Sequence, residues 1–202
     1  MSLPFVTLTS IAAPMLEDNI DTDIIIPSRE MQSTGKTGLA AGLFAGRRYN
    51  PGSRDPNPDF ILNQPPFRTA AILLAGDNFG CGSSREHAVW ALAEHGVRAV
   101  IAPSFSPIFE GNAARGGVLP LRLPRDVIAA LAANPAPLTI DLPDQTVTSG
   151  DRHYAFAIDA EAKAMLIGGL DAIDLTLQSA AMIAQWQAQD RQARPWVYLP
   201  TL

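Results

Sequence analysis

The segment from Gly76 to His87, GDNFGCGSSREH, combines three glycines with two serines and an arginine. Glycine allows the backbone to adopt positive φ and to approach a ligand closely. A helix that begins after such a turn presents N–H groups and the positive end of its dipole, which together favour an anion. Arg85 adds a guanidinium that binds a carboxylate through two parallel donors. The segment therefore predicts a carboxylate site beside the hydroxyls of Ser83 and Ser84.

A structural role explains some of the same residues. Ser83 can cap a helix in which Glu86 stands three residues later, and this pair has the pattern of a capping box. Glycine-rich turns after strands are also common, so capping and anion binding both remain open from the residues alone. A phosphate-binding loop is not indicated, because the sequence lacks the pattern GxxxxGK[ST].

The elements around this segment predict parallel α/β pairing. Apolar runs of strand length occur at 69–76, 98–102 and 118–123, and helices are expected at 83–96, 103–117 and 124–134. Alternation of strands and helices is typical of a parallel sheet. Three strands in a meander are expected across 137–159, followed by helical elements from about 160 to 190.

The N-terminal part predicts a first strand near 5–9, then an acidic turn, DNIDTD, and a short buried strand at Ile24–Ile26. A loop from about 28 to 38 follows, and we expect it to be exposed and mobile because it is rich in Gly, Ser and Thr. We expect residues 1–202 to form a single domain.

The bulk composition excludes several classes of function. The net charge is −5 and no run of Lys or Arg occurs, which argues against a nucleic-acid surface. The longest apolar run falls short of the roughly 18 residues that a membrane span needs. Cys81 is the single cysteine, which excludes an internal disulfide and fits a cytoplasmic protein. One thiolate cannot hold an iron–sulfur cluster, and three widely spaced histidines do not predict zinc, so we expect no metal bound by this chain.

Four stretches carry a resemblance to a known family. DNIDTDIIIP at 18–27, GDNFGCGSSREHAVWAL at 76–92 and IAPSFSPIFEGNAARGGVLPL at 101–121 resemble the swivelling domain of the aconitase family. GLDAIDLTLQ at 169–178 resembles the C-terminal part of bacterial 3-isopropylmalate dehydratase small subunits. The resemblance covers most of the chain in the right order. It implies a layered β/β/α fold with a partly parallel sheet and C-terminal helices.

The resemblance also implies an activity and a partner. Such hydro-lyases interconvert 2-isopropylmalate and 3-isopropylmalate through 2-isopropylmaleate, in leucine biosynthesis. Their [4Fe–4S] cluster belongs to a separate large subunit, and one iron of it acts as a Lewis acid on the departing hydroxyl. The small subunit supplies the base that takes a proton from the carbon beside a carboxylate. This chain is therefore expected to act only with a large subunit, on a small di- or tricarboxylate.

Residue roles follow from the family motif. The resemblance assigns the base to Ser83 and substrate binding to Ser84, Arg85 and Lys36. A serine is a poor base unless its alkoxide is stabilised, here by the helix N-terminus and Arg85. The DTD residues are explained by a turn with capping side chains, and His87 by packing, although each could support the site. Arg115 could reach the site or simply end a helix, and the sequence does not decide between the two. The possible supporting residues are Asp21, Thr22, Asp23 and His87.

Two residues depart from the family pattern. The loop typically carries an apolar pair at the positions of Glu30 and Met31, and Arg at the position of Lys36. Lysine lacks the planar fork of arginine, so the exchange is not neutral at a carboxylate site. These departures favour an alternative, a sister hydro-lyase acting on homoaconitate, citraconate or a dimethylmaleate. A binding module without a partner is a third hypothesis, disfavoured by the intact GSSREH.

Overall fold

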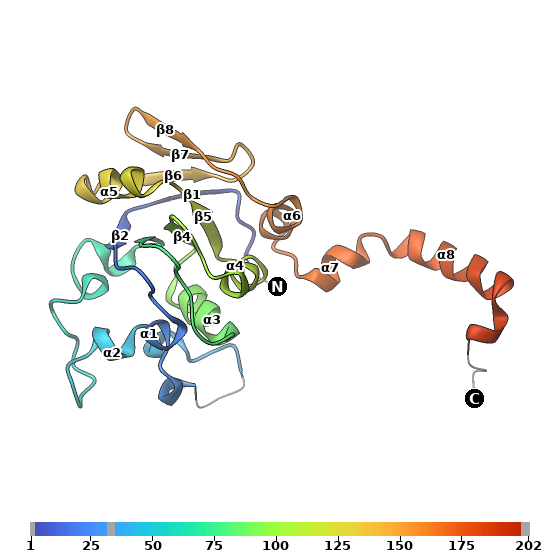
Figure 1. Cartoon of the computed structure of the whole chain (residues 1–202), viewed down its shortest axis with the longest axis horizontal. Coiled ribbons are helices and arrows are strands. Elements are labelled where there is room, and N and C mark those ends of the chain that lie inside the picture. The colour runs from blue at the N-terminus through green and yellow to red at the C-terminus, as the bar shows by residue number, and fades with distance from the viewer. Residues whose placement is uncertain (1–2, 32–34, 199–202) are drawn as a thin grey trace.

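A four-stranded parallel sheet forms the centre of the molecule (Figure 1). The computed structural model describes residues 3–31 and 35–198 of the chain. The sheet has the order β2-β3-β4-β5, with all three pairings parallel. Its strands are β2 (Ala12–Met15), β3 (Ile72–Ala75), β4 (Ala99–Ala102) and β5 (Leu119–Arg122). The α/β fold with a parallel sheet is confirmed.

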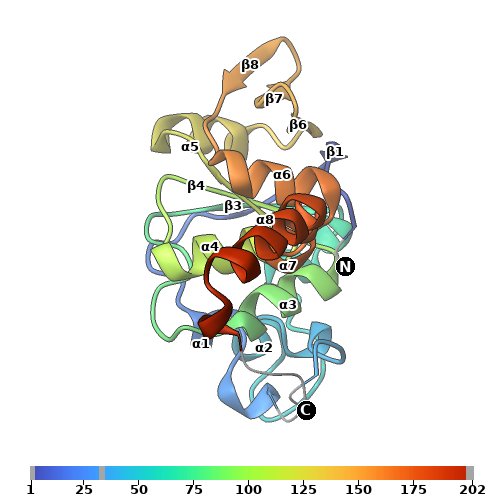
Figure 2. The same cartoon turned by 90° about the vertical axis from the view of Figure 1, so that its right-hand side faces the viewer.

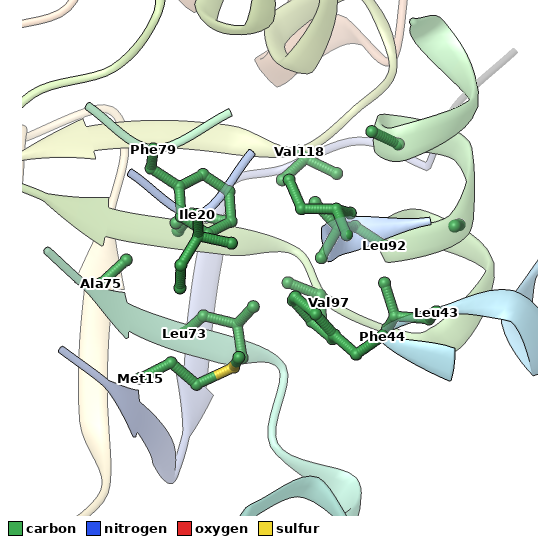
Figure 3. Close-up of a cluster of buried hydrophobic side chains, with 14 of the residues drawn as sticks. Met15, Ile20, Leu43, Phe44, Leu73, Ala75, Phe79, Leu92, Val97 and Val118 are labelled. Carbon is green, nitrogen blue, oxygen red and sulfur yellow. The ribbon is translucent and has the colours of Figure 1, made fainter. Parts of the chain in front are cut away.

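Side chains of the parallel strands alternate between two apolar cores, as the period of two in a strand requires. Leu73 and Val100 face a core with α3 (Glu86–His95) and α4 (Pro107–Arg115). Ile72 and Ile101 face the second core, which includes residues of α5 (Arg125–Ala133). Figure 3 shows the first core, where Met15, Leu73, Ala75, Ile20, Phe44, Phe79 and Leu92 meet.

A second, antiparallel sheet covers the α5 side of the molecule (Figure 1). Its order is β1-β6-β7-β8, with strands β1 (Thr7–Ser10), β6 (Leu138–Asp141), β7 (Thr146–Ser149) and β8 (Arg152–Ala155). Leu138, Ile140 and Val147 lie in the second core, opposite the parallel strands. The predicted meander of three strands is confirmed, and the layers are helices, parallel sheet, then antiparallel sheet with α5.

The N-terminal prediction was partly wrong. The strand expected at Ile24–Ile26 is a helical turn, α1 (Thr22–Ile25). The segment is helical because the Asp21 carboxylate caps the turn, accepting a hydrogen bond from the N–H of Ile24 at 2.7 Å. Ile25 and Ile26 are nevertheless fully buried, so the sequence indicated their burial but not their conformation.

Short helical turns make up much of the segment between β2 and β3. These are η1 (Ser28–Glu30), η2 (Ala40–Gly42), α2 (Ala45–Arg48), η3 (Ile61–Asn63) and η4 (Phe67–Thr69). Of the loop that we expect to be mobile, residues 32–34 lie outside the described residues. Its mobility therefore stays a prediction.

The C-terminal part is helical, as predicted, with α6 (Ala160–Gly168), α7 (Ala172–Leu177), α8 (Ala180–Ala193) and the turn η5 (Pro195–Val197). Figure 2 shows α4 between α3 and α6, in agreement with their contacts. In Figure 1, α7 and α8 extend away from the two sheets. Across 3–31 and 35–198, no helix has both the length and the apolar character needed to cross a membrane.

Candidate functional site

The Gly-rich turn after β3 lies directly against the acidic turn after β2. Residues 76–83 and 17–22 are about 60 positions apart in the sequence, but hydrogen bonds join them along their whole length. The pairs are Gly76 N to Glu17 O, Asp77 N to Asp18 Oδ1, Asn19 N to Asp77 O, Gly80 N to Ile20 O and Thr22 N to Cys81 O. Because β2 and β3 are parallel neighbours, their carboxyl ends deliver both turns to the same edge of the sheet.

This pairing changes the role expected for Ser83. Helix α3 begins only at Glu86, with Arg85 as N-cap residue and no side-chain cap hydrogen bond. The predicted capping box of Ser83 and Glu86 is therefore wrong. Two contacts hold the backbone of Ser83 in this position: Ser83 O accepts a tertiary hydrogen bond from Thr22 Oγ1 at 3.1 Å and a local one from the N–H of Arg85 at 2.9 Å. Ser83 is consequently exposed just before the helix rather than bound to its first turn.

The DTD residues have a local role and a second role across the two turns. Asp21 caps α1, as the structural interpretation predicted. Thr22 is buried, and its hydroxyl and N–H both bond to the Gly-rich turn. Asp23 forms an ion pair with Arg85 and also accepts a hydrogen bond from Ser28 Oγ at 3.2 Å. The motif therefore fixes both the backbone at Ser83 and the side chain of Arg85.

The pair of Arg85 and Asp23 sets the charge beside Ser83. The guanidinium is about 25% exposed and donates to Asp23 through Nη1. Its hydrogen bond lowers the pKa of the Asp23 carboxyl below the ordinary value, so Asp23 is ionised at neutral pH. An arginine has five donors in a planar fork. The site thus presents an oriented guanidinium next to two exposed hydroxyls, those of Ser83 and Ser84.

Gly80 is required by the close approach of α4 to this turn. A Cβ at Gly80 would lie 2.1 Å from Cγ of Phe109, which packs edge-on against Phe79. We expect Gly80→Ala to lower the free energy of unfolding by about 3 kcal/mol, through overpacking and positive φ together. Urea unfolding of the small subunit measures the effect.

Gly52→Ala is the matched control for that variant. Gly52 has the same φ of +76° as Gly80, but a Cβ there would meet no described atom within 4 Å. We expect a loss of only about 1 kcal/mol, the cost of the backbone conformation. Equal losses in the two variants would show that Phe109 yields to the added methyl group.

Lys36 lies over the ring of Trp90, on the side of α3 that carries Trp90 and Glu94 and is called its outer side below. Its Nζ is 5.3 Å from the centroid of the Trp90 ring, and the centroid of the His87 ring is 4.8 Å from that of Trp90. His87 is half-buried in this arrangement, which agrees with a packed histidine. A cavity of about 470 Å³ is lined by Lys36, Glu86, Trp90, Glu94 and Arg115, among others, but not by residues 83–85.

Arg115, left undecided by the sequence, is an exposed residue of this cavity wall. Its Nη2 donates to Asn112 Oδ1 at 2.6 Å. Arg115 and Lys36 therefore line one cavity, while Asp21, Thr22 and Asp23 meet the segment 81–85. The predicted site residues thus form two groups. The first lies before α3, where the DTD residues meet the segment 81–85, and the second is the cavity beside α3 that Lys36 and Arg115 line.

Glu30, which departs from the family pattern, is neutralised locally. Its carboxylate pairs with Arg54 Nη2 at 2.5 Å and with Arg29 Nε at 3.4 Å, and its side chain is only 10% exposed. Arg54 in turn lies 5.0 Å from the centroid of the Tyr49 ring. The negative charge of Glu30 is therefore part of an anchored network at the start of the loop.

The surroundings of Cys81 favour the neutral thiol. Burial raises the pKa of the Cys81 thiol, and the nearby Asp21 adds to the effect, so the thiol stays protonated at neutral pH. Within the described ranges, no three His, Cys, Asp or Glu side chains gather in a way that could hold a metal ion.

Sequence reasoning missed Glu94, which binds three backbone N–H groups of the segment after Lys36. A signal was present, because an acidic residue in the last turn of a helix opposes the helix dipole. Such a residue implies a compensating partner. The pattern does not say which segment of the chain supplies that partner.

Comparison with protein families gives three successive matches along the chain. The model described as the aconitase C-terminal domain matches residues 3–126. A LeuD_N model matches residues 127–160. The model that describes the C-terminal domain of the 3-isopropylmalate dehydratase small subunit matches residues 173–198, which include α7 and α8.

Individual proteins agree with these family matches. The chain is 51% identical to a 3-isopropylmalate dehydratase small subunit of Cupriavidus necator, over 96% of this chain and 98% of that protein. It is 47% identical to the corresponding protein of Paracoccus denitrificans, with the same coverage. A solved 3-isopropylmalate dehydratase (LeuD) structure from Methanocaldococcus jannaschii superposes with a TM-score of 0.67 at 25% identity, covering 89% of this chain and 98% of that one.

Proposed function

This chain belongs to the family of 3-isopropylmalate dehydratase small subunits, and from that premise we propose that Ser83, Ser84 and Arg85 are its contribution to the active site. It is a component of a hydro-lyase complex that acts in leucine biosynthesis. The reaction is the interconversion of 2-isopropylmalate and 3-isopropylmalate through 2-isopropylmaleate. The observation that carries the residue assignment is the pairing of 17–22 with 76–83, which leaves Ser83 exposed beside Arg85.

Ser83 is the base in this proposal. The C–H bond beside a substrate carboxylate breaks, and its proton goes to Oγ of Ser83, which acts as the alkoxide. The electron pair stays on carbon and then forms the double bond as the C–O bond on the neighbouring carbon breaks and the hydroxyl leaves with its own electron pair, so that water is lost overall. The alkoxide needs stabilisation, because a serine hydroxyl is otherwise too weak a base at neutral pH. Two features can provide it: the N-terminus of α3, three residues on, and the guanidinium of Arg85.

Ser84, Arg85 and Lys36 bind the substrate carboxylates. Arg85 is suited to a bidentate contact because Asp23 holds its guanidinium through Nη1, which leaves its orientation fixed before substrate arrives. Lys36 contributes a point charge from the outer side of α3. Asp21, Thr22 and Asp23 support the site by holding the backbone at Ser83 and the side chain of Arg85.

The partner is a large subunit that holds the [4Fe–4S] cluster. A cluster needs three or four thiolates from its protein, and this chain has Cys81 alone, so its residues do not fit the group. When bound, the cluster supplies Lewis-acid chemistry at the substrate hydroxyl. The part of this chain is confined to removing the proton and binding the carboxylates.

The substrate of this proposal is an isopropylmalate rather than an acid of the sister enzymes. The charge of Glu30 would favour a sister enzyme only if its carboxylate faced the isopropyl group of the substrate. Its carboxylate is held by Arg54 and Arg29 and is largely buried, so it does not oppose an apolar substrate side chain. Lys36 keeps the positive charge that the family carries as arginine at this position.

The experiment that tests this function mixes this chain anaerobically with the large subunit from the same genome, after reconstitution of the cluster. Formation of 2-isopropylmaleate from 3-isopropylmalate is followed by ultraviolet absorbance. We expect turnover only when both subunits are present. Turnover of citraconate or a dimethylmaleate but not of 3-isopropylmalate would contradict the substrate, and turnover without this chain would contradict its role.

A further inference from the structure

The carboxylate of Glu94 binds three successive backbone N–H groups. Those of Gly38, Leu39 and Ala40 donate to it at 2.7, 2.5 and 2.8 Å. The hydrogen bond from Gly38 is foremost among the effects that lower the pKa of Glu94, so the carboxylate is ionised at neutral pH. A carboxylate is one of few groups that can accept all three at once, since it offers about four lone-pair sites.

Glu94 stands where a negative charge is unfavourable for the helix itself. It lies one residue before His95, the last residue of α3, near the negative end of the helix dipole. Helix α3 gains nothing from a carboxylate there, whereas the segment 38–40 gains three charge-assisted hydrogen bonds. The position is therefore explained by what Glu94 holds rather than by the helix to which it belongs.

The segment held by Glu94 leads directly to Lys36. Lys36 lies two residues before Gly38, and its Nζ sits over Trp90, one helical turn before Glu94 on α3. Going from Ala40 back to Lys36, the chain follows the outer side of α3 from its last turn toward its first. Lys36, Trp90 and Glu94 also line the same cavity. The two contacts thus fix the direction in which this segment runs past the helix.

We propose that Glu94 is a positioning residue that sets the affinity for substrate by fixing the segment 38–40 and, through it, the side chain of Lys36. The inference rests on the proposed function, because the binding of a substrate carboxylate by Lys36 is part of that proposal. Glu94 itself touches no substrate. Its carboxylate acts by reducing the freedom that Lys36 would otherwise lose on binding, which is the effect of preorganisation.

The first test compares Glu94→Gln with wild type in the assembled two-subunit enzyme. Glutamine has similar size but offers a single carbonyl oxygen, so at least one N–H of 38–40 loses its acceptor. We expect KM for 3-isopropylmalate to rise about tenfold while kcat stays within about twofold, since Ser83 and Arg85 are untouched. Glu94→Asp keeps the charge and should recover part of the affinity. Glu161→Gln, on the exposed first turn of α6, is the matched control and should leave both constants unchanged.

The second test separates Glu94 from Lys36. Lys36→Gln should also raise KM, and the double variant with Glu94→Gln should be no worse than the poorer single variant, because both changes remove one function. Two outcomes would overturn the role of Glu94 and leave that of Lys36. One is additive losses in the double variant, and the other is a rise in KM for Lys36→Gln with no rise for Glu94→Gln. No rise in either single variant would overturn the carboxylate role of Lys36 together with the inference.

Hydrogen exchange of the assembled enzyme gives a readout that does not depend on turnover. The amides of Gly38, Leu39 and Ala40 should exchange faster in Glu94→Gln than in wild type or Glu161→Gln, because their acceptor is weakened. Unchanged exchange in a peptide covering these amides would show that Glu94 does not hold the segment, whatever the kinetics.

Discussion

Ser83→Ala is expected to lower kcat of the assembled enzyme by about 10³-fold or more, because it removes the group that we propose as acceptor of the substrate proton. KM should change little, since the proposed carboxylate ligands Ser84, Arg85 and Lys36 are kept. The measurement is the initial rate of 2-isopropylmaleate formation from 3-isopropylmalate at saturating substrate. This is the largest effect that we expect from any single substitution.

The controls for Ser83→Ala are folding and assembly. Ser83 is exposed and its backbone carbonyl, not its side chain, holds Thr22, so the variant should unfold at the same urea concentration as wild type. It should also bind the large subunit with unchanged affinity. Ser149→Ala in β7 of the antiparallel sheet is the matched serine control and should be fully active. A Ser83→Ala enzyme with normal kcat would exclude Ser83 as the base.

Arg85→Lys is expected to lower kcat/KM by about 100-fold, mainly through a rise in KM. Lysine can keep a charge near Asp23, but it lacks the planar fork that binds a carboxylate through two donors. The loss should therefore appear in substrate affinity more than in stability. Steady-state kinetics with 3-isopropylmalate, over a substrate range extended at least tenfold above the wild-type KM, measure it.

Arg122→Lys is the control for this exchange. Arg122 also forms a two-donor pair, with Glu110 at 3.1 and 2.7 Å, but at the surface near β5 and α4. Arg122 is not among the residues proposed to bind substrate, so the loss of its fork should leave KM unchanged. Stability should change little as well, because exposed ion pairs contribute little to it. If Arg85→Lys kept the wild-type KM, Arg85 would serve only to bind Asp23.

Local patterns predicted the parts of the fold that local forces determine. The apolar runs of β3, β4 and β5 and the helices between them follow from the period of hydrophobic residues. The end of α3 was also predicted, because Gly96 adopts φ of +103° there, a conformation that favours glycine. The second strand, β2, was not predicted: one strand was expected near 5–9, and only Ile11 separates β1 from β2.

Local patterns failed at two turns, one because of a side-chain cap within the turn and one because of a contact with a distant segment. Three isoleucines in a row favoured a strand, but the cap from Asp21 makes Thr22–Ile25 helical. Ser83 and Glu86 had the spacing of a capping box, but the hydrogen bond from Thr22 holds Ser83 outside the helix. In both cases a tertiary or side-chain contact overrode a valid local preference.

The sequence by itself determined which residues we propose for the chemistry, because the glycines, hydroxyls and guanidinium of 76–87 are consecutive and their types predict a carboxylate site. Only the tertiary structure decided how they are held. The pairing of 17–22 with 76–83, the ion pair of Asp23 with Arg85, and the binding of 38–40 by Glu94 join residues 54 to 62 positions apart. Hydrogen bonds over such separations have no local pattern, since any exposed turn offers the same donors and acceptors until the sheet brings two of them to one edge.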